Sequence, residues 1–282
     1  MLPQKIEQSK SIITKAIQDF KPYKIVIMIS GGDDSLTVLA LCKYLGIKVD
    51  YLIHANTGTG LPQATDFVRK IAEISNIAYL EGQAQRDYIN YVTRKGFFGR
   101  GNKAHSFAYH VLKANYFRKL VSTHIRQRKR NRKVLLLNGV RLEESQKRMD
   151  NFANKVYRHD PAAKSNIWVN IIQYWTKEDC LYLLNGMNQE RSPVAKCLNR
   201  SGECMCGTMQ DDLDRYTASK FDPTWGKWLD DLEKHVINDC GFPWKWGSDI
   251  PKTWQMEQQG QLSMFSKAVL DFMPACHSCK QL

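Results

Sequence analysis

Residues 24–46 read KIVIMISGGDDSLTVLALCKYLG, and this stretch decides the fold. The apolar run at 25–29 has the length and branching of a buried parallel strand, and the apolar residues of 35–45 are typical of a buried helix. Between them lies SGGDDS, in which two glycines let the backbone turn sharply and approach a ligand without an intervening Cβ. The hydroxyls of Ser30 and Ser35 and the first N–H groups of the helix then face one point. We therefore expect an anion site there.

This turn differs from the two commonest nucleotide-binding loops. It lacks the G-x-x-x-x-G-K-[ST] spacing and the lysine of a P-loop, and it is not the G-x-G-x-x-G turn of dinucleotide-binding proteins. It matches S-G-G-x-D-S instead. Three further segments follow it in order: NTGTGLP at 56–62, GVRLEESQKR at 139–148 and YWTKED at 174–179.

Together these four segments resemble the N-type ATP pyrophosphatases and the phosphoadenosine phosphosulfate (PAPS) reductases. The family patterns are S-G-G-x-D-S, D-T-G-x-x-[FL]-P, G-x-R-x-x-E-S-x-x-R and W-[ST]-x-x-D, and the resemblance covers about residues 24–185. It implies an α/β fold of the adenine nucleotide alpha hydrolase-like kind, a Rossmann-like parallel sheet with helices on both faces. Asn56 stands where the family has Asp, which weakens any role that needs a negative charge there.

Composition indicates a folded protein of one or two units. The chain has 282 residues, of which 43% are hydrophobic, enough for a packed core. We expect an ATP-pyrophosphatase domain at 1–192 and, where the composition changes to Cys, Trp and Gly, a small C-terminal module at 193–282. No apolar stretch approaches the roughly 20 residues of a membrane span. The N-terminus reads as an amphipathic helix without a signal-peptide core, so we expect a cytoplasmic protein.

The periodicity of the chain predicts a series of βαβ units, and hence a parallel sheet. Strands are expected at 24–29, 48–53, 78–80, 134–140 and 166–172. Helices are expected at 35–45, 65–75, 106–127 and 177–184. Thr176 and Asp179 have the spacing of a capping pair for the last of these helices.

The positive charge of the chain is concentrated in one segment. Residues 88–142 contain fourteen of the 41 lysines and arginines and no Asp or Glu, and the rest of the chain is nearly neutral. Because aromatic residues interleave these charges, we expect contact with a nucleic acid. A solvated basic surface is the alternative, and part of the charge could serve ATP. The predicted nucleic-acid contacts are Arg126, Arg128, Lys129, Arg130, Arg132 and Lys133.

Eight cysteines in a chain of this kind point to metal or redox chemistry and not to a disulfide scaffold. Five of them fall into two groups, which could together supply a four-thiolate site: Cys197, Cys204, Cys206, Cys276 and Cys279. Zinc and an iron–sulfur cluster both accept four thiolates. The resemblance to sulfur-transfer pyrophosphatases favours the iron–sulfur cluster. Unlinked thiols, or a redox pair at the tail, remain open alternatives.

The loop and the motifs after it define the predicted ATP site. The expected ATP and pyrophosphate ligands are Ser30, Gly31, Gly32, Asp33, Asp34, Ser35, Thr57, Gly58, Gly139, Arg141 and Arg148. Of these, Asp34, Ser35 and Arg141 are the predicted catalytic residues. Asp34 suits Mg²⁺ or the cap of the helix, and Arg141 suits phosphate oxygens. An ordinary Gly-Gly turn is the alternative for the loop, and ion pairs on a helix face are the alternative for Arg148.

The function expected from these features is ATP pyrophosphatase activity in sulfur transfer. The chain would adenylate a substrate oxygen, release pyrophosphate and prepare that position for sulfur. The basic segment and grouped cysteines make it similar to the ATP-pyrophosphatase subunits of DNA phosphorothioation systems, which implies a DNA backbone phosphate as substrate and a cysteine desulfurase or other sulfur donor as partner. DNA is favoured over tRNA, and a homodimer is compatible with the sequence.

Three other functions stay open at this stage. One is a PAPS or other sulfonucleotide reductase, although the tail ACHSCKQL lacks the E-C-G-[LI]-H segment of PAPS reductases and no two cysteines are adjacent. Another is a tRNA thiolase. The third is a non-catalytic module that binds a nucleotide.

Overall fold

A six-stranded sheet forms the centre of the molecule. The computed structural model describes residues 2–144 and 155–254. The strand order is β3-β2-β1-β4-β6-β5, with β5 antiparallel at the edge and all other neighbours parallel. The strands are β1 (Lys24–Met28), β2 (Tyr51–Asn56), β3 (Ala78–Gln83), β4 (Val134–Leu137), β5 (Tyr157–Asp160) and β6 (Ala163–Val169). The predicted Rossmann-like fold is confirmed.

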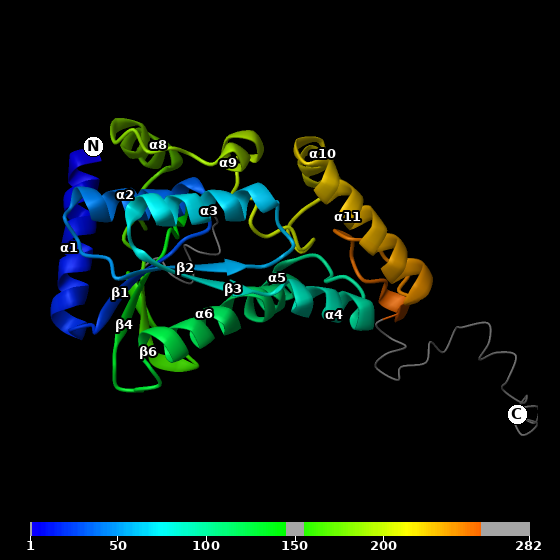
Figure 1. Ribbon diagram of the computed structural model, residues 1–282, viewed down its shortest axis with the longest axis horizontal. Helices are drawn as coiled ribbons and strands as arrows, with labels where there is room; N and C mark the ends of the chain where they lie inside the picture. The colour runs from blue at the N-terminus through cyan, green and yellow to red at the C-terminus, as the bar shows by residue number, and fades with distance from the viewer. Residues whose placement is uncertain (1, 145–154, 255–282) are drawn as a thin grey trace, which may run out of the picture.

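Helices cover both faces of this sheet (Figure 1). Alternate residues of the central strands enter two different cores, so Ile27 packs with one helical layer and Val26 with the other. The first layer is made of α1 (Leu2–Phe20), α2 (Asp33–Tyr44), α3 (Pro62–Ser75) and α8 (Lys177–Gly186). The second layer is the end of one long helix, which contributes Phe117, Val121 and Ile125. Strands buried on both sides explain the continuous apolar runs in the sequence.

The long helix runs without a break through residues 102–125. It consists of α5 (Asn102–Tyr109), η1 (His110–Ala114), α6 (Asn115–Leu120) and η2 (Val121–Ile125), and η1 and η2 are π-helical. The prediction of a helix at 106–127 is correct in kind, but it misses the first turn. Turns of π-helix occur often at functional sites, and η1 lies beside the cavity described below.

Several strand boundaries differ from the prediction for an identifiable reason. The strand expected at 48–53 lies at Tyr51–Asn56. The prediction ended too early because the last part of the strand contains two polar residues, which interrupt the apolar pattern. His54 is fully buried and bonds the carbonyl of Ile29 through Nδ1 at 2.9 Å, and Asn56 donates to Glu81 at 3.0 Å. The strand expected at 166–172 is β6, and it begins three residues earlier because it pairs with β5, which the pattern did not predict.

The C-terminal segment adds helices and a third core. The helices are α9 (Pro193–Leu198), α10 (Asp212–Phe221), α11 (Pro223–Lys234) and η4 (His235–Asp239). Their core includes Trp225, Trp244 and Trp246, together with Tyr88 and Val92 of α4 (Gln85–Lys95), a helix that the sequence analysis did not predict. Residues 193–254 therefore share a core with the segment after β3, and the domain boundary at 192 remains a prediction.

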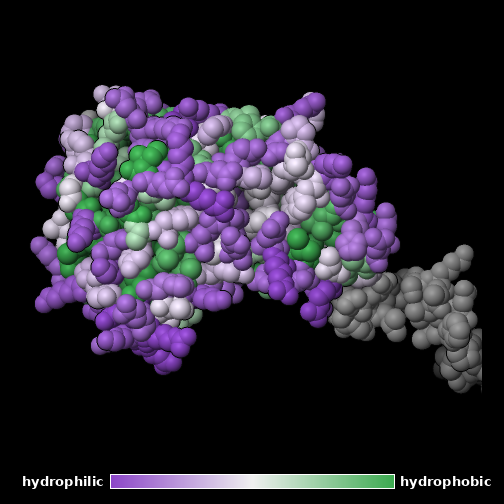
Figure 2. All heavy atoms as spheres, viewed as in Figure 1, coloured by the Kyte–Doolittle hydropathy of each residue, from purple (hydrophilic) through white to green (hydrophobic). Residues whose placement is uncertain are grey.

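The surface seen in Figure 2 is mainly hydrophilic, with hydrophobic residues in separate patches. Within the described ranges, no helix has both the length and the apolar character needed to cross a bilayer.

Candidate active site

The turn after β1 has the glycine and hydroxyl geometry that an anion site would need. Gly31 has φ +75°, and a Cβ there would lie 3.2 Å from the Val68 side chain, so only glycine fits without strain. The Ser30 N–H donates to Ser35 Oγ at 3.2 Å, and Ser35 Oγ donates to the Gly32 carbonyl at 2.9 Å. The two hydroxyl oxygens lie 3.3 Å apart, within hydrogen-bond distance, so both serine hydroxyls are next to each other in the turn.

The N-terminus of α2 is open to a ligand. Its N-cap residue is Gly32, and no side chain of the described residues caps the helix. The suggested role of Asp34 as the cap of this helix is therefore wrong. The first N–H groups of a helix and its dipole attract anions when no side chain satisfies them.

The turn lies where the sheet changes direction. The chain proceeds outward from β1 through β2 and β3, and then starts again at β4 on the other side of β1. Open α/β sheets bind ligands at the carboxyl edge at such a point. Gly139, just after β4, approaches α2 so closely that a Cβ would lie 2.8 Å from the Asp34 carbonyl carbon. The two predicted motifs are therefore brought together.

Arg141 is the buried cation of this crevice. Its side chain is only 7% exposed; Nε donates to Asp34 Oδ1 at 2.9 Å, and a terminal nitrogen donates to Glu143 Oε2 at 2.5 Å. Burial opposes its charge, but the Asp34 carboxylate outweighs burial, so the pKa of Arg141 is raised. The guanidinium thus stays charged beside the loop.

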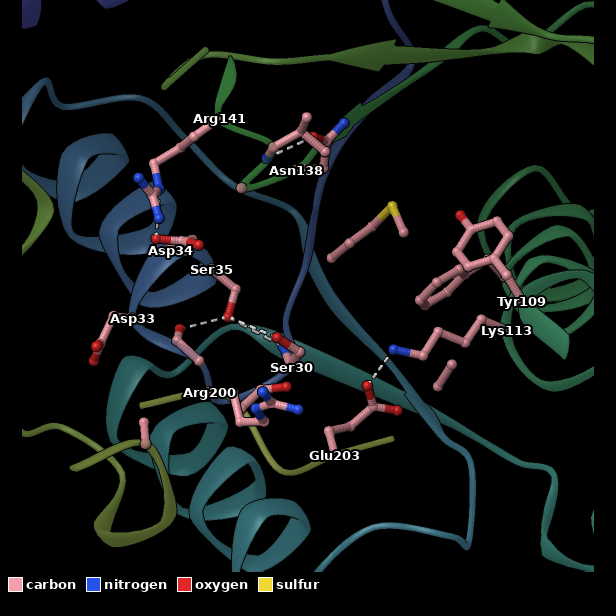
Figure 3. A pocket seen from close by; sticks show the side chains of 18 of the residues that line it. Ser30, Asp33, Asp34, Ser35, Tyr109, Lys113, Asn138, Arg141, Arg200 and Glu203 are labelled. Carbon is pink, nitrogen blue, oxygen red and sulfur yellow. Dashed lines mark hydrogen bonds and ion pairs between the residues drawn. The ribbon is translucent and has the colours of Figure 1, made fainter. Parts of the chain in front are cut away.

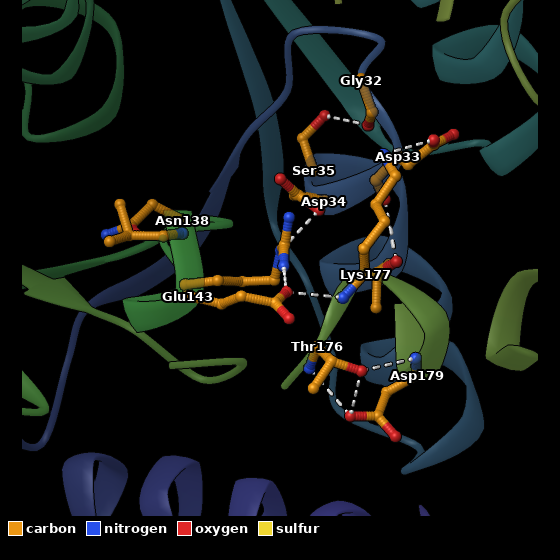
Figure 4. Close-up of polar contacts among 12 residues, drawn as sticks. Gly32, Asp33, Asp34, Ser35, Asn138, Glu143, Thr176, Lys177 and Asp179 are labelled. Carbon is orange, nitrogen blue, oxygen red and sulfur yellow. Dashed lines mark hydrogen bonds and ion pairs between the residues drawn. The ribbon is translucent and has the colours of Figure 1, made fainter. Parts of the chain in front are cut away.

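Asp33 points away from the loop and has a structural role (Figure 4). Its fully buried carboxylate accepts from Lys177 Nζ at 2.7 Å and from two nitrogens of Arg191, each at 2.8 Å. Burial alone would raise the pKa of Asp33, but the bonds from Arg191 and Lys177 outweigh it and the pKa is lowered. Both oxygens are occupied, so Asp33 does not offer a free ligand to pyrophosphate or metal.

The sequence motif at 174–179 explains how Lys177 reaches Asp33. Thr176 accepts from the Asp179 N–H at 3.2 Å and Asp179 accepts from the Thr176 N–H at 2.8 Å, so the predicted capping pair is confirmed. Lys177 is consequently the first residue of α8. Its N–H donates to Glu143 Oε2 at 2.9 Å. Because the same Glu143 oxygen accepts from Arg141, Glu143 connects the start of α8 to the Arg141 side chain.

A cavity of about 720 Å³ opens beside the turn (Figure 3). Its walls come from the carboxyl ends of the central strands, the long helix and the loop after α9. Polar and charged residues on the wall are Ser30, Asp33, Asp34, Ser35, Tyr109, Lys113, Asn138, Arg141, Arg158, Lys177, Asn199, Arg200, Ser201 and Glu203. The volume of the cavity is typical of small-ligand sites. Nine of these wall residues were not predicted as site residues: Tyr109, Lys113, Asn138, Arg158, Lys177, Asn199, Arg200, Ser201 and Glu203.

Thr57 and Gly58 do not line this cavity. Thr57 is fully buried and donates through Oγ1 to the Glu203 carbonyl at 2.7 Å. Gly58 has φ +66° and leaves no room for a Cβ, which would lie 2.2 Å from Gln85 Cβ. The TGTG loop therefore positions the loop at 202–206, and the predicted direct contacts of these two residues with ATP are not supported.

The predicted metal cysteines are only partly brought together. Within residues 2–144 and 155–254, no three His, Cys, Asp or Glu side chains form a group that could hold a metal ion. Cys197 is exposed on α9, whereas Cys206 is buried. A hydrogen bond from the Cys204 thiol and another from Thr208 lower the pKa of Cys206. Cys276 and Cys279 lie outside the described residues, as does Arg148.

The predicted nucleic-acid contacts lie at the amino ends of the parallel strands, whereas the turn at 30–35 lies at their carboxyl ends. They directly precede β4, whereas the turn at 30–35 follows β1, and these two strands are parallel neighbours. Strands of this length separate the two edges by roughly 15 Å. Arg126 is buried, with its Nε unpartnered among the described residues, while Arg132 lies 4.1 Å from the centre of the Tyr23 ring. The exposed members are Arg128, Lys129, Arg130 and Lys133.

The chain belongs to the phosphoadenosine phosphosulfate reductase domain family, whose model matches residues 24–195. It therefore carries a PAPS reductase-like nucleotide-binding domain. No curated protein matches the sequence.

Two solved structures illustrate what the fold is similar to. One is a PAPS reductase from Candida auris in a phosphate complex, with 14% identity, a TM-score of 0.47 and coverage of 67% of this chain and 84% of that chain. The other is an FMN adenylyltransferase from Candida glabrata with FAD and inorganic pyrophosphate, with 14% identity, a TM-score of 0.48 and coverage of 70% and 60%, respectively.

Proposed function

We propose that this chain is an ATP pyrophosphatase that adenylates an oxygen of its substrate, releases pyrophosphate and so prepares that oxygen for replacement by sulfur. The substrate that we propose is a phosphate of a DNA backbone. One observation carries the enzymatic part: the uncapped N-terminus of α2 and the two serine hydroxyls face the same cavity as the buried, charged Arg141.

Each of these groups has a task in the proposed reaction. The backbone N–H groups and the hydroxyls of Ser30 and Ser35 hold the β- and γ-phosphates. Arg141 stabilises the charge that grows as the bond between the α-phosphorus and the bridging oxygen breaks. Asp34 keeps the guanidinium oriented through the 2.9 Å bond to its Nε. The substrate oxygen attacks the α-phosphorus, and pyrophosphate leaves with the bond's electron pair.

Mg²⁺ fits this site through Asp34. Arg141 takes Oδ1 of that carboxylate, while no partner of Oδ2 is found in the described part of the chain, and the residue lines the cavity. A carboxylate oxygen beside phosphates is the usual protein ligand of Mg²⁺, which would neutralise the leaving pyrophosphate when bound. The thiols do not provide an equivalent fit for a cluster, since the described residues lack a third ligand beside Cys204 and Cys206.

The acid-free segment supports a nucleic-acid substrate. The helix at 102–125 lines the cavity with Tyr109, Lys113 and Phe117 in its middle and ends at the basic loop, so roughly 12–24 Å of helix separate the cavity from that loop. A duplex lying along the helix would contact the exposed Lys119 and Lys129 while its backbone reached the cavity. The sulfur would come from a cysteine desulfurase or another donor protein.

The test is release of pyrophosphate from ATP and Mg²⁺, measured alone and with duplex DNA, tRNA or PAPS. We expect DNA to stimulate release in the wild type. Ser35→Ala and Arg141→Ala should each reduce release at least about 100-fold, because each removes a group that binds the leaving pyrophosphate. Ser75→Ala is the matched control, since the Ser75 hydroxyl donates to the Ala72 carbonyl of its own helix and Ser75 does not line the cavity.

The same assay separates the alternatives. Unchanged release in Ser35→Ala would refute the loop assignment. Stimulation by tRNA alone would indicate a tRNA thiolase, and sulfite release from PAPS with a dithiol reductant would indicate a sulfonucleotide reductase. ATP binding without turnover under every condition would indicate a nucleotide-binding module.

A further inference from the structure

Glu203 is a buried carboxylate in the cavity wall, and one of its oxygens has no hydrogen-bond partner among the described residues. The residue is 3% exposed, its Oε2 accepts from Lys113 Nζ, and its Oε1 has no hydrogen-bond partner among the described residues. An unsatisfied buried carboxylate oxygen is costly, so such an atom is expected to meet a donor. Glu203 lies beyond residues 24–195, the range that the family model matches.

The backbone around Glu203 is held rigidly. Its carbonyl accepts from Thr57 Oγ1 at 2.7 Å, and the next residue but one, Met205, donates its N–H to Thr59 Oγ1 at 3.1 Å. A Cβ on Gly60 would lie only 2.3 Å from the Glu203 carbonyl oxygen, so the two loops are in direct contact. The carboxylate is therefore fixed before any ligand arrives.

Lys113 places hydrogen-bond donors beside the unpartnered Glu203 oxygen. Its ammonium has three N–H groups, and Glu203 is the one partner that the described residues provide. Burial opposes the charge of Lys113, but Glu203 outweighs burial and the pKa is raised, so the ammonium keeps all three donors. The pair thus offers one acceptor and unused donors side by side.

The position of the pair suits the base of a nucleotide. Lys113 and Glu203 lie on the opposite side of Ser30 from Asp34 and Arg141 (Figure 3). The cavity wall also contains apolar residues, among them Met28, Ala55 and Phe117. A nucleotide with its phosphates in the turn would extend its base toward this end of the cavity.

We propose that Glu203 and Lys113 read the amino edge of the adenine ring, with Glu203 Oε1 accepting from the exocyclic amine and Lys113 donating to the adjacent ring nitrogen. This inference rests on the proposed function. It assigns base specificity to two residues from different segments, the helix at 102–125 and the loop after α9. If the pair merely tied these two segments together, Oε1 would need no donor from a ligand, and changing it would alter stability but not the choice of base.

The test compares two nucleotides by calorimetric titration of the full chain in Mg²⁺: ATP, and purine riboside triphosphate, which lacks only the amine. Wild type should bind ATP about 10- to 100-fold more tightly, the difference expected for a hydrogen bond to a charged group. In Glu203→Gln the amide oxygen turns to Lys113 and its NH₂ faces the amine. This variant should lose that preference for ATP while its affinity for purine riboside triphosphate changes less than about twofold.

Two further variants are controls, one for the loss of a surface charge and one for the loss of the ion pair itself. Glu190→Gln changes a half-exposed acid that pairs with Lys70 on the surface, and it should keep the ATP preference. The double variant Lys113→Met with Glu203→Leu replaces the ion pair by an apolar pair that should preserve the fold. It should also bind the two nucleotides about equally.

The outcomes distinguish this inference from the function on which it rests. Equal binding of the two nucleotides to wild type, or an unchanged ATP preference in both Glu203 variants, would overturn the reading of the base and leave the pyrophosphate site intact. A wild type that binds neither nucleotide nor pyrophosphate would overturn both.

Discussion

Asp33 shows how one buried carboxylate can hold a loop in place through ion pairs with residues from much later in the chain. Its buried carboxylate ties the first turn of α2 to Lys177 and Arg191, which come from much later in the chain. Asp33→Asn leaves two cations without their partner. Because these cations are partly exposed, we expect a loss of about 2–3 kcal/mol in the free energy of unfolding at pH 7, less than for a fully buried pair.

The same residue gives this loss a defined pH dependence. The pKa of Asp33 is lowered in the folded protein, so its stabilising effect is complete above the ordinary value of about 4 and is lost as the pH falls through the lower folded value. Urea denaturation of wild type and Asp33→Asn at pH 7 and near pH 3 measures the difference. An equal gap at both pH values would contradict the ion pairs, and Glu190→Gln should change stability by less than about 0.5 kcal/mol.

The sequence predicted some of the residues that the structure brings together at the cavity, but not those that arrange them. Local spacing identifies Ser30, Ser35 and Arg141, because the turn and the strand end dictate their chemistry. It cannot identify Lys113 or Glu203, which become neighbours only when the helix at 102–125 meets the loop after α9. The one available signal for Glu203 was an acid inside an otherwise Cys- and Gly-rich loop. Asp33 was predicted to contact the phosphates because no local pattern indicates that Arg191 pairs with its carboxylate.

At the scale of elements, we predict that the shape of the turn between β1 and α2 is needed for anion binding. Two glycines with positive φ, one inside the turn and one outside it, allow a matched test. Gly31 and Gly46 both have positive φ, so alanine at either position should cost about 1–2 kcal/mol of stability. Only at Gly31 would the added Cβ also press on α3, 3.2 Å from the Val68 side chain. We expect Gly31→Ala to weaken pyrophosphate binding at least tenfold by titration and Gly46→Ala to leave it unchanged. Equal effects on binding would show that the turn's shape is not what binds the anion.

Element types were predicted better than their ends. The βαβ order and the parallel sheet follow from apolar runs that are continuous where strands are buried on both faces. The helix α4 escaped the sequence analysis because only Tyr88 and Val92 of it are buried. The basic loop at 126–133 illustrates the other limit: its charge was evident in the sequence, whereas its place at the amino edge depends on the direction of β4.

At the scale of the whole molecule, the shared third core predicts that the N-terminal part does not fold by itself. Residues 193–254 cover Tyr88, Val92 and Phe97, which are all almost fully buried. A chain ending at residue 192 would expose these side chains to water, so we expect it to aggregate or to lose cooperative unfolding. A chain ending at residue 254 keeps every contact described above and should unfold cooperatively. Circular dichroism during urea titration distinguishes the two, and a cooperative 1–192 fragment would support two independent domains.

The bond from Thr57 to the Glu203 carbonyl joins residues 146 positions apart in the sequence. Such distant contacts form late during folding, because a long loop must close first. The cavity wall that carries Glu203 is thus expected to be among the last parts of the fold to assemble. A nucleotide that contacts both loops would hold them closed by mass action. A higher ligand concentration would then stabilise the contact between these two loops, which is the part of the fold that forms last.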